Sequence, residues 1–277
     1  MKKHSVIGGG GLKLNVLEGG QPDGPAILLL HGFSQAAQSW QHQFGSDLAL
    51  RYRLVAMDIR GHGASEKPGD AAHYTTSELW ADDVKAVIET LGLRQTLLVG
   101  WSYSGLLICD FLRHHGSQSL AGVVFCGGVT KVGSDQAGAM LGPKLLKHLP
   151  AVFSTDAAVA TETMGQFVRD CQAQPMTDRD YYEALGYNLT ATPEVRLGLF
   201  SRVVDNDDIL AGMTLPTLVL HGTDDEIILP AASEHIVGKI RGARLFMIDG
   251  AAHCPFAEAP GAFNAEVASF ADQVSKH

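Results

Sequence analysis

The 277-residue sequence predicts an α/β fold with a mostly parallel, doubly wound sheet and an inserted helical cap. Continuous apolar runs recur along the chain without alternation, which is typical of strands covered on both faces. Segments with helical spacing separate most of these runs, as in strand–helix repeats. One long stretch near the middle of the chain contains no convincing strand and interrupts the repeat.

The strands are expected in chain order as follows. Residues 12–16 alternate between apolar and polar side chains, as an antiparallel edge strand would. The later runs are apolar throughout and comprise residues 26–30, 54–57, 96–99, 123–126, 217–220 and 245–248. An antiparallel start followed by buried strands predicts a mostly parallel sheet.

Helices are expected between these strands. Apolar residues from Trp80 to Leu91 follow at helical spacing, and Gly92 ends that helix. The last helix begins after Pro260 and carries one apolar stripe, formed by Phe263, Val267, Phe270 and Val274. Both helices are long enough to cover a face of the sheet.

Residues 134–210 break the alternation. Short helical pieces are expected at 144–148, 157–171, 178–185 and 193–203, and Pro193 after Thr192 is a good helix start. The stretch is far longer than the connections that are usual in compact domains. We therefore expect residues 134–210 to form a helical cap, or lid, over a core made of residues 1–133 and 211–277.

Composition narrows the class of partner. The net charge of −9 and the lack of a long basic run argue against nucleic acid. Gly8 to Gly11 occupy the position at which a secretory signal peptide has its apolar region. No apolar run approaches the length of a transmembrane helix. The four cysteines lack metal-ligand spacing. We expect a cytoplasmic protein with no membrane partner, no metal and no cofactor, and the oligomeric state stays open.

Ser102 lies in the most informative stretch of the chain, Val99 to Gly105. Apolar runs precede and follow it, so a strand, a sharp turn and a helix are expected, with Ser102 at the apex. Gly100 leaves room for the tight turn. A serine so placed presents its hydroxyl beyond the sheet. On these residues alone, a Ser/Gly-rich turn without chemistry remains an alternative.

Candidates for a base and an orienting acid follow two later strands. Asp224 and Asp225 come after residues 217–220, and His253 comes after residues 245–248. The carboxyl ends of parallel strands share one rim of a sheet. Ser102, one of the two aspartates and His253 are therefore expected to meet, which is the residue set of a serine nucleophile with a histidine base.

Several motifs together resemble the α/β-hydrolase superfamily, especially its capped bacterial serine esterases, lactonases and cofactor-free haloperoxidase-like members. The matching motifs are Leu30-His31-Gly32-Phe33, Asp58-Ile59-Arg60-Gly61-His62-Gly63-Ala64-Ser65, the turn at Ser102, the Asp225 loop and Ala252-His253. They extend from about residue 12 to the C-terminus. Ser104, where the superfamily usually has a glycine, is the main departure.

The resemblance implies roles for single residues. Ser102 is the nucleophile and His253 the base; the acid is Asp225, four residues after His221, rather than Asp224. The oxyanion hole is implied to be the backbone N–H groups of Phe33 and Tyr103. Because the backbone donates, the side chains at these two positions are expected to be almost free to vary.

The expected activity is hydrolysis of small, mostly apolar carboxylic esters. The substrate pocket is expected to include four aromatic residues, Trp101, Phe153, Phe167 and Tyr182. A lactone, or a carbon–carbon bond beside a carbonyl, is the alternative substrate for the same residues, because one fold and triad serve many reactions. The third hypothesis is a sensor that binds a small ligand without catalysis. The presence of all three triad residues and both oxyanion positions weighs against it.

Overall fold

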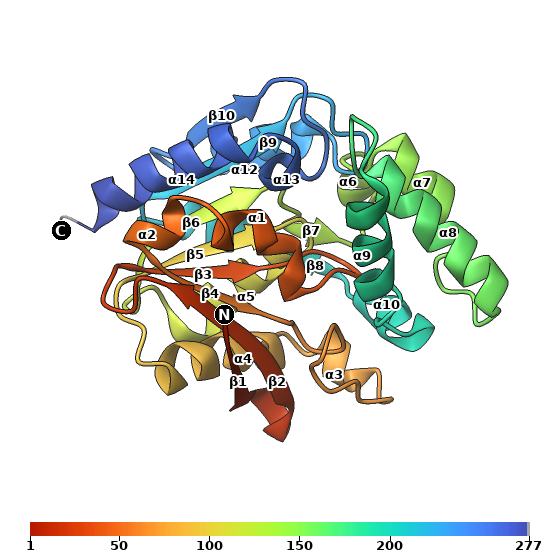
Figure 1. The fold of residues 1–277 in the computed structure, drawn as a ribbon, viewed down its shortest axis with the longest axis horizontal. Coiled ribbons are helices and arrows are strands. Elements are labelled where there is room, and N and C mark those ends of the chain that lie inside the picture. Colours follow the sequence, from red (N-terminus) through yellow and green to blue (C-terminus); the bar gives the residue numbers. More distant parts are fainter. Residues whose placement is uncertain (276–277) are drawn as a thin grey trace.

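The computed structural model describes residues 1–275 and contains an eight-stranded sheet in the order β1-β2-β4-β3-β5-β6-β9-β10 (Figure 1). β2 is antiparallel to both β1 and β4, and all pairs from β4 to β10 are parallel. The predicted mostly parallel sheet is confirmed. Its strands are β1 (Lys2–Ile7), β2 (Lys13–Gly20), β3 (Ala26–Leu30), β4 (Arg53–Met57), β5 (Thr96–Trp101), β6 (Leu120–Cys126), β9 (Thr217–Gly222) and β10 (Arg244–Ile248).

The expected edge strand at residues 12–16 is not at the edge. It belongs to β2, and β1 pairs outside it, with Val6 opposite Leu14. Only Val6 is buried in β1, so this strand has no apolar pattern that the sequence could reveal. Lys2 and Lys3 place charge on the outer strand, which discourages pairing with another sheet.

Helices cover both faces of the sheet. In Figure 1, α14 (Pro260–Val274) lies toward β10 at the top and α4 (Ser77–Thr90) lies toward β1 and β2 at the bottom, and α5 (Ser104–His115) packs against α4 and β5. Hydrogen bonds join α14 to α1 (Gln41–Phe44) and α2 (Leu48–Arg51). The remaining elements here are the 3-10 helices η1 (Gly9–Gly11) and η2 (Ala37–Trp40), α3 (Ala72–Thr75), α11 (Asp207–Gly212), α12 (Pro230–Lys239) and α13 (Pro255–Glu258).

Five helices follow one another between β7 (Lys131–Val132) and β8 (Val204–Asp205), and we call residues 133–203 the inserted segment. They are α6 (Asp135–Gly138), α7 (Pro143–His148), α8 (Ala157–Asp170), α9 (Asp178–Asn188) and α10 (Pro193–Phe200). Figure 1 shows them together at one end of the sheet, in green. α10 begins at Pro193, as predicted, and the Thr192 hydroxyl caps it.

The ends of the inserted segment meet in a short two-stranded sheet, where β7 and β8 pair antiparallel. Residues 134–210 were expected to lack strands, and β8 is too short for a periodic pattern to reveal it. α11, which falls inside that expected range, packs against α5 and α12 rather than against the inserted helices.

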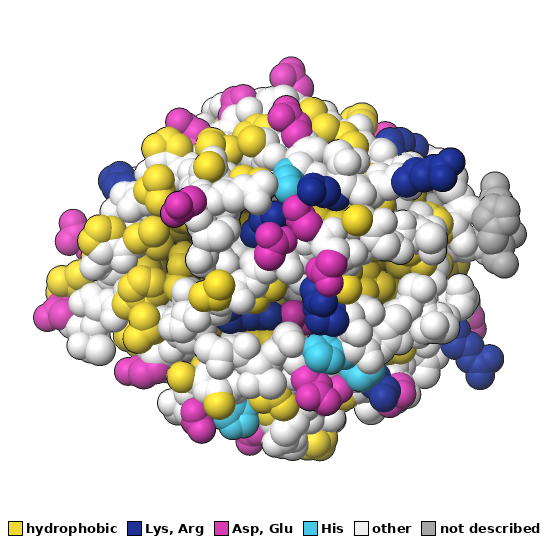
Figure 2. All heavy atoms as spheres, turned by 180° about the vertical axis from the view of Figure 1, so that it is seen from behind, with side chains coloured by type: hydrophobic (Ala, Val, Ile, Leu, Met, Phe, Trp, Pro, Cys, Tyr) yellow, Lys and Arg dark blue, Asp and Glu magenta, His cyan; other side chains and the backbone are white. Residues whose placement is uncertain are grey.

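The inserted segment also carries much of the exposed apolar surface. Figure 2 shows apolar side chains gathered at the left, the side on which this segment lies. Its large exposed apolar residues are Leu146, Val159, Tyr182, Leu189, Leu197 and Val203. Within residues 1–275, none of the helices combines the length and apolar character needed to span a bilayer.

Candidate active site

Ser102 occupies a strained turn between β5 and α5. Its φ of 55° lies in the left-handed region, which a residue with a Cβ rarely adopts. A Cβ on Gly100 would lie 2.7 Å from the Ser104 carbonyl oxygen, so only glycine lets strand and helix approach this closely. A Cβ on Gly32 would lie 2.9 Å from the Ser102 Cβ, so the loop after β3 passes directly against the serine.

Ser104, the residue that departs from the usual glycine, is fully buried at the start of α5. Its hydroxyl donates a short hydrogen bond to the His31 carbonyl oxygen. The extra polar group is therefore satisfied, as burial requires. The bond also ties the helix after Ser102 to the loop after β3, so this serine replaces the glycine at little cost.

His253 lies between Ser102 and Asp225. Its Nε2 is 2.9 Å from the Ser102 Oγ, and its Nδ1 is 2.7 Å from the Asp225 Oδ2. Asp224 is exposed and its Oδ1 accepts a hydrogen bond from Thr223 instead. The ends of β5, β9 and β10 thus bring the three expected residues into one hydrogen-bonded row, with Asp225 and not Asp224 facing the histidine.

Asp225 is buried but well supplied with donors. Its Oδ1 accepts hydrogen bonds from the backbone N–H groups of Ile227, at 2.8 Å, and Ile228, at 3.0 Å. Burial opposes ionisation, yet the charge of a protonated His253 and the hydrogen bonds from His221 and His253 outweigh it and hold the pKa of Asp225 well below its usual range. The carboxylate therefore stays ionised beside His253.

His221, named in the sequence only as a marker for the acid, contacts that acid. Its Nε2 lies 3.2 Å from the Asp225 Oδ2 and 2.8 Å from the Ile228 carbonyl oxygen. The second ring nitrogen, Nδ1, lies 2.6 Å from the Ser233 hydroxyl. Its place at the end of β9, four residues before Asp225, was the available signal for this role.

The loop that carries His253 is held by residues that the sequence did not single out. The Glu258 Oε1 accepts hydrogen bonds from the N–H groups of Ala252, at 3.0 Å, and Cys254, at 3.3 Å. The Trp101 indole N–H donates to the His253 carbonyl oxygen at 2.8 Å. A carboxylate reaching back to amides on both sides of His253 has no sequence pattern that would predict it.

The amides of Phe33 and Tyr103 are the expected oxyanion donors. Within residues 1–275, neither N–H group donates to a protein acceptor. The peptide that carries the Phe33 N–H is oriented at its other end, because the His31 Nδ1 lies 2.8 Å from the Gly32 carbonyl oxygen. The Ile59 N–H donates to the His31 Nε2, which leaves the proton on Nδ1.

His62 holds the next residue of the same loop. Its Nε2 accepts a hydrogen bond from the Ser34 N–H at 3.1 Å. Burial lowers the pKa of His31 to about 4, and burial together with the nearby His31 lowers the pKa of His62 to about 3. Both rings are neutral at physiological pH, and each can accept the backbone N–H that it faces.

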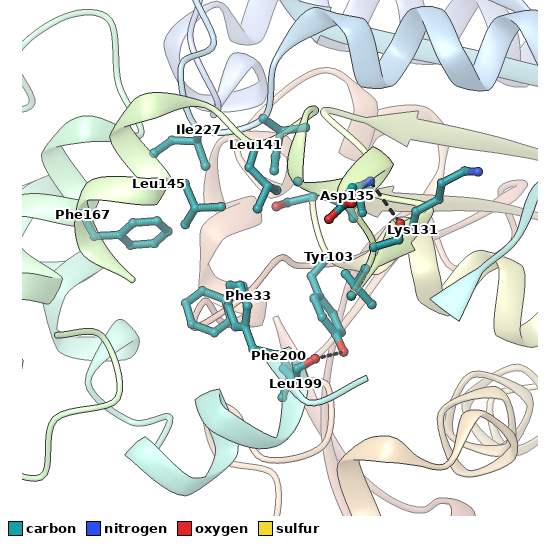
Figure 3. A pocket seen from close by; sticks show the side chains of 18 residues that line it. Phe33, Tyr103, Lys131, Asp135, Leu141, Leu145, Phe167, Leu199, Phe200 and Ile227 are labelled. Atoms are coloured by element: carbon teal, nitrogen blue, oxygen red, sulfur yellow. Dashed lines mark hydrogen bonds between the residues drawn. The ribbon is translucent and has the colours of Figure 1, made fainter. Parts of the chain in front are cut away.

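A cavity of about 390 Å³ has Ser102 among its lining residues, and Figure 3 shows other side chains around it. The loop after β3, the start of α5 and the inserted segment contribute its walls. Its lining residues include Phe33, Tyr103, Leu141, Leu145, Phe167, Leu199, Phe200 and Ile227. The cavity is thus mostly apolar, and Ser102 forms part of its wall.

Of the four aromatic residues expected to form the pocket, Phe167 alone lines this cavity. Trp101 lies beneath His253, with ring centroids 5.5 Å apart. Phe153 packs behind Phe200, and Tyr182 is 67% exposed on the outer side of α9. Aromatic character identified residues of the inserted segment but not the face on which each one points.

The charged groups at the cavity differ in their pairing. The Lys131 Nζ lies 2.9 Å from carboxylate oxygens of both Asp205 and Asp207, so its charge is neutralised away from Ser102. Asp135 lies exposed at the rim, at the start of α6. Among residues 1–275 there is also no group of three or more His, Cys, Asp or Glu side chains arranged to hold a metal ion.

Comparisons with known proteins agree with this architecture. Residues 27–266 match the model of the alpha/beta hydrolase family. The chain is 27% identical over 262 residues to a non-heme haloperoxidase of Rhodococcus erythropolis, covering 89% of this chain and 92% of that protein. The range 27–266 that matches the family model includes Ser102, Asp225 and His253.

Two solved structures are similar over their full length. The esterase RhEst1 from Rhodococcus sp. ECU1013 is 35% identical with a TM-score of 0.93, over 99% of this chain and 100% of that one. A putative aryl esterase from Burkholderia cenocepacia is 27% identical with a TM-score of 0.87, over 100% of both chains. The chain therefore belongs to the α/β-hydrolase family.

Proposed function

We propose that this protein is a serine hydrolase that cleaves small, mostly apolar carboxylic esters through an acyl-enzyme on Ser102. The observation that carries the proposal is the row of contacts from the Ser102 Oγ through His253 to Asp225. Similarity to RhEst1 and to the putative aryl esterase supports an ester as the substrate.

In the proposed reaction, His253 Nε2 removes the proton of the Ser102 hydroxyl as its oxygen attacks the ester carbonyl carbon. The carbonyl oxygen becomes an oxyanion and accepts hydrogen bonds from the amides of Phe33 and Tyr103. His253 then gives its proton to the departing alcohol. A water molecule, activated by the same histidine, attacks the acyl-enzyme and releases the acid.

We further propose that the inserted segment acts as the cap of the enzyme and selects the substrate. Leu145, Phe167 and Phe200 come from this segment and line the cavity next to Ser102. An apolar acyl or alcohol group would bury its surface against these side chains, at roughly 25 cal/mol for each Å² removed from water. Ester specificity would then reside largely in residues that do no chemistry.

Covalent labelling tests the nucleophile. A small organophosphate should inactivate the enzyme with the addition of one phosphoryl group, and peptide mapping should locate it on Ser102. Complete inactivation with Ser102 unmodified would refute the proposal. A panel of p-nitrophenyl esters, lactones and vinylogous diketones then separates the ester from the other bonds that the same residues could attack.

A further inference from the structure

The helix α10 contacts both loops that carry the proposed oxyanion donors. Its Arg196 reaches Ser34, next to Phe33, with 3.1 Å between the Nε and the Ser34 Oγ. The Tyr103 hydroxyl donates to the Leu199 carbonyl oxygen at 3.1 Å, a contact drawn in Figure 3. Phe200 packs edge-to-face on Phe33, with ring centroids 5.1 Å apart. The side chains expected to be free at positions 33 and 103 are therefore both held by the inserted segment.

Arg196 is unusual because it is only 1% exposed and bonds to neutral oxygens. Its Nη1 donates to the Val152 carbonyl oxygen at 3.1 Å, and its Nη2 donates to the Asn188 carbonyl oxygen at 3.3 Å. Within residues 1–275 its hydrogen bonds go to these two carbonyl oxygens and the Ser34 hydroxyl, and no carboxylate forms an ion pair with it. Burying a guanidinium without a counter-charge is costly. The three acceptors that hold Arg196 therefore indicate that its buried place has a role in the structure of the site.

Ser34 is the point at which Arg196 meets the loop after β3. Its φ is 59°, a strained conformation for a residue with a side chain. The Ser34 hydroxyl donates to the Asn188 carbonyl oxygen at 3.0 Å while accepting from Arg196. Its N–H is bound by His62. These contacts hold a strained residue directly after the Phe33 amide.

We propose that Arg196 is a positioning residue for the oxyanion hole, holding Ser34 and, through it, the Phe33 amide in the orientation needed for catalysis. The proposal rests on the function proposed above for Phe33. It makes the oxyanion hole dependent on a helix of the inserted segment, so α10 must be seated before the Phe33 amide is correctly placed.

The cavity argues against a substrate-binding role for Arg196. Its lining residues include Leu199 and Phe200, at the end of the same helix, but not Arg196. The guanidinium is instead occupied by Ser34, Val152 and Asn188. A side chain committed to internal acceptors acts on the substrate only through the atoms it holds.

The test compares Arg196→Met, Arg196→Lys, Ser34→Ala and the double variant Ser34→Ala/Arg196→Met. Loss of a whole oxyanion donor costs about 10²–10³ in kcat, so a misplaced donor should cost on the order of tenfold to a hundredfold. KM should stay within about twofold, because the interaction is made mainly in the transition state. Arg196→Lys should fall between wild type and Arg196→Met.

Two further readouts distinguish positioning from general damage. The affinity for phenylboronic acid, which forms a tetrahedral adduct with the nucleophile, should fall by the same factor as kcat. In the Ser34→Ala background, Arg196→Met should change kcat by less than about twofold, because coupled residues are not additive. Leu197→Ala is the matched control, since Leu197 follows Arg196 on the same helix and its side chain is 54% exposed.

Several results would overturn the proposal. They are a wild-type kcat in Ser34→Ala, equal effects of Arg196→Met in both backgrounds, or a raised KM with unchanged kcat. If Arg196→Met does not fold, Ser34→Ala and Arg196→Lys decide the question. Failure of the underlying function would look different, because the wild-type enzyme itself would then resist phenylboronic acid and organophosphate.

Discussion

The rim of the sheet and the inserted segment build the site by different means. At the rim, Ser102, Asp225 and His253 each follow a strand, and their side chains form one hydrogen-bonded row. In the inserted segment, the contributing groups are the Leu199 carbonyl oxygen, apolar side chains and one buried guanidinium. The proposed reacting groups therefore lie in the turns and loops that follow regular strands, whereas much of the cavity wall and the contacts to Ser34 and Tyr103 come from the helices of the inserted segment.

Loss of the proposed nucleophile at the rim should lower activity most. Ser102→Ala should reduce kcat by about 10⁴-fold or more, because triad members contribute on this scale in serine hydrolases. The fold should be unchanged, since the substitution removes only a hydroxyl. Ester hydrolysis together with far-ultraviolet circular dichroism checks both statements. A folded Ser102→Ala enzyme with appreciable kcat would place the nucleophile elsewhere.

The second effect separates two adjacent carboxylates. Asp225→Asn should reduce kcat by about 10³–10⁴-fold, because an amide cannot orient and stabilise a protonated His253 as a carboxylate does. Asp224→Asn is the control and should leave kcat within about threefold, since Asp224 is exposed and does not contact His253. Steady-state kinetics of the two variants decide the matter, and a reversed ranking would assign the acid to Asp224.

The third effect concerns the support of the rim in acid. His31 and His62 have folded-state pKa values of about 4 and about 3, below the value of about 6.5 for a free histidine. As the pH falls, the histidines of the unfolded chain therefore take up protons before those of the folded protein. The stability that comes from keeping the two rings neutral is complete above about pH 7 and is lost as the pH falls toward 4. For each ring, the free energy of unfolding should fall by roughly 2 kcal/mol between pH 7 and pH 5.

Urea unfolding at the two pH values measures this loss. His62→Gln should lose less stability between pH 7 and pH 5 than the wild type, because one titrating ring is gone. His114→Gln, at an exposed position, should behave as the wild type does. Equal acid losses in His62→Gln and the wild type would show that His62 is not held neutral in the folded protein.

The smallest effect belongs to the apolar side chains of the inserted segment that line the cavity. Leu145→Ala and Phe200→Ala enlarge the cavity, so kcat/KM should shift toward longer acyl chains. In a hydrophobic pocket, one methylene changes the discrimination between two substrates by about 1–3 kcal/mol. We therefore expect the preferred acyl chain to become longer by one or two carbons. The rate of labelling by a small organophosphate should change little in both variants. Variants that fold yet resist labelling as His253→Ala would imply that these two side chains take part in the chemistry.

The regular part of the molecule could be predicted well from the sequence. Apolar runs identified β3 to β6, β9 and β10, because buried parallel strands are apolar throughout. β1 was not predicted because a single buried side chain gives no periodic pattern. β8 was not predicted because it has only two residues. The order Ser102, Asp225, His253 was readable because each residue follows a strand that the pattern had already located.

The support of the site was beyond the sequence because it depends on long-range contacts. Glu258 binds amides on both sides of His253, and Arg196 reaches Ser34 from 162 positions away. Neither residue belongs to a local pattern. The outward orientation of Tyr182 and the position of Trp101 beneath His253 likewise depend on packing between elements. Residue type was informative for chemistry, but the direction of a side chain had to come from the structure.

Trapping the acyl-enzyme would show which residue is the nucleophile. The enzyme should be mixed with p-nitrophenyl butyrate, quenched in acid within milliseconds and analysed by intact mass and peptide mapping. We expect one butyryl group on Ser102, together with a burst of nitrophenol equal to the enzyme concentration if deacylation is the slower step. Ser102→Ala should show neither. A butyryl group on another residue, or hydrolysis at the wild-type rate by Ser102→Ala, would contradict the proposed role of Ser102 as the nucleophile.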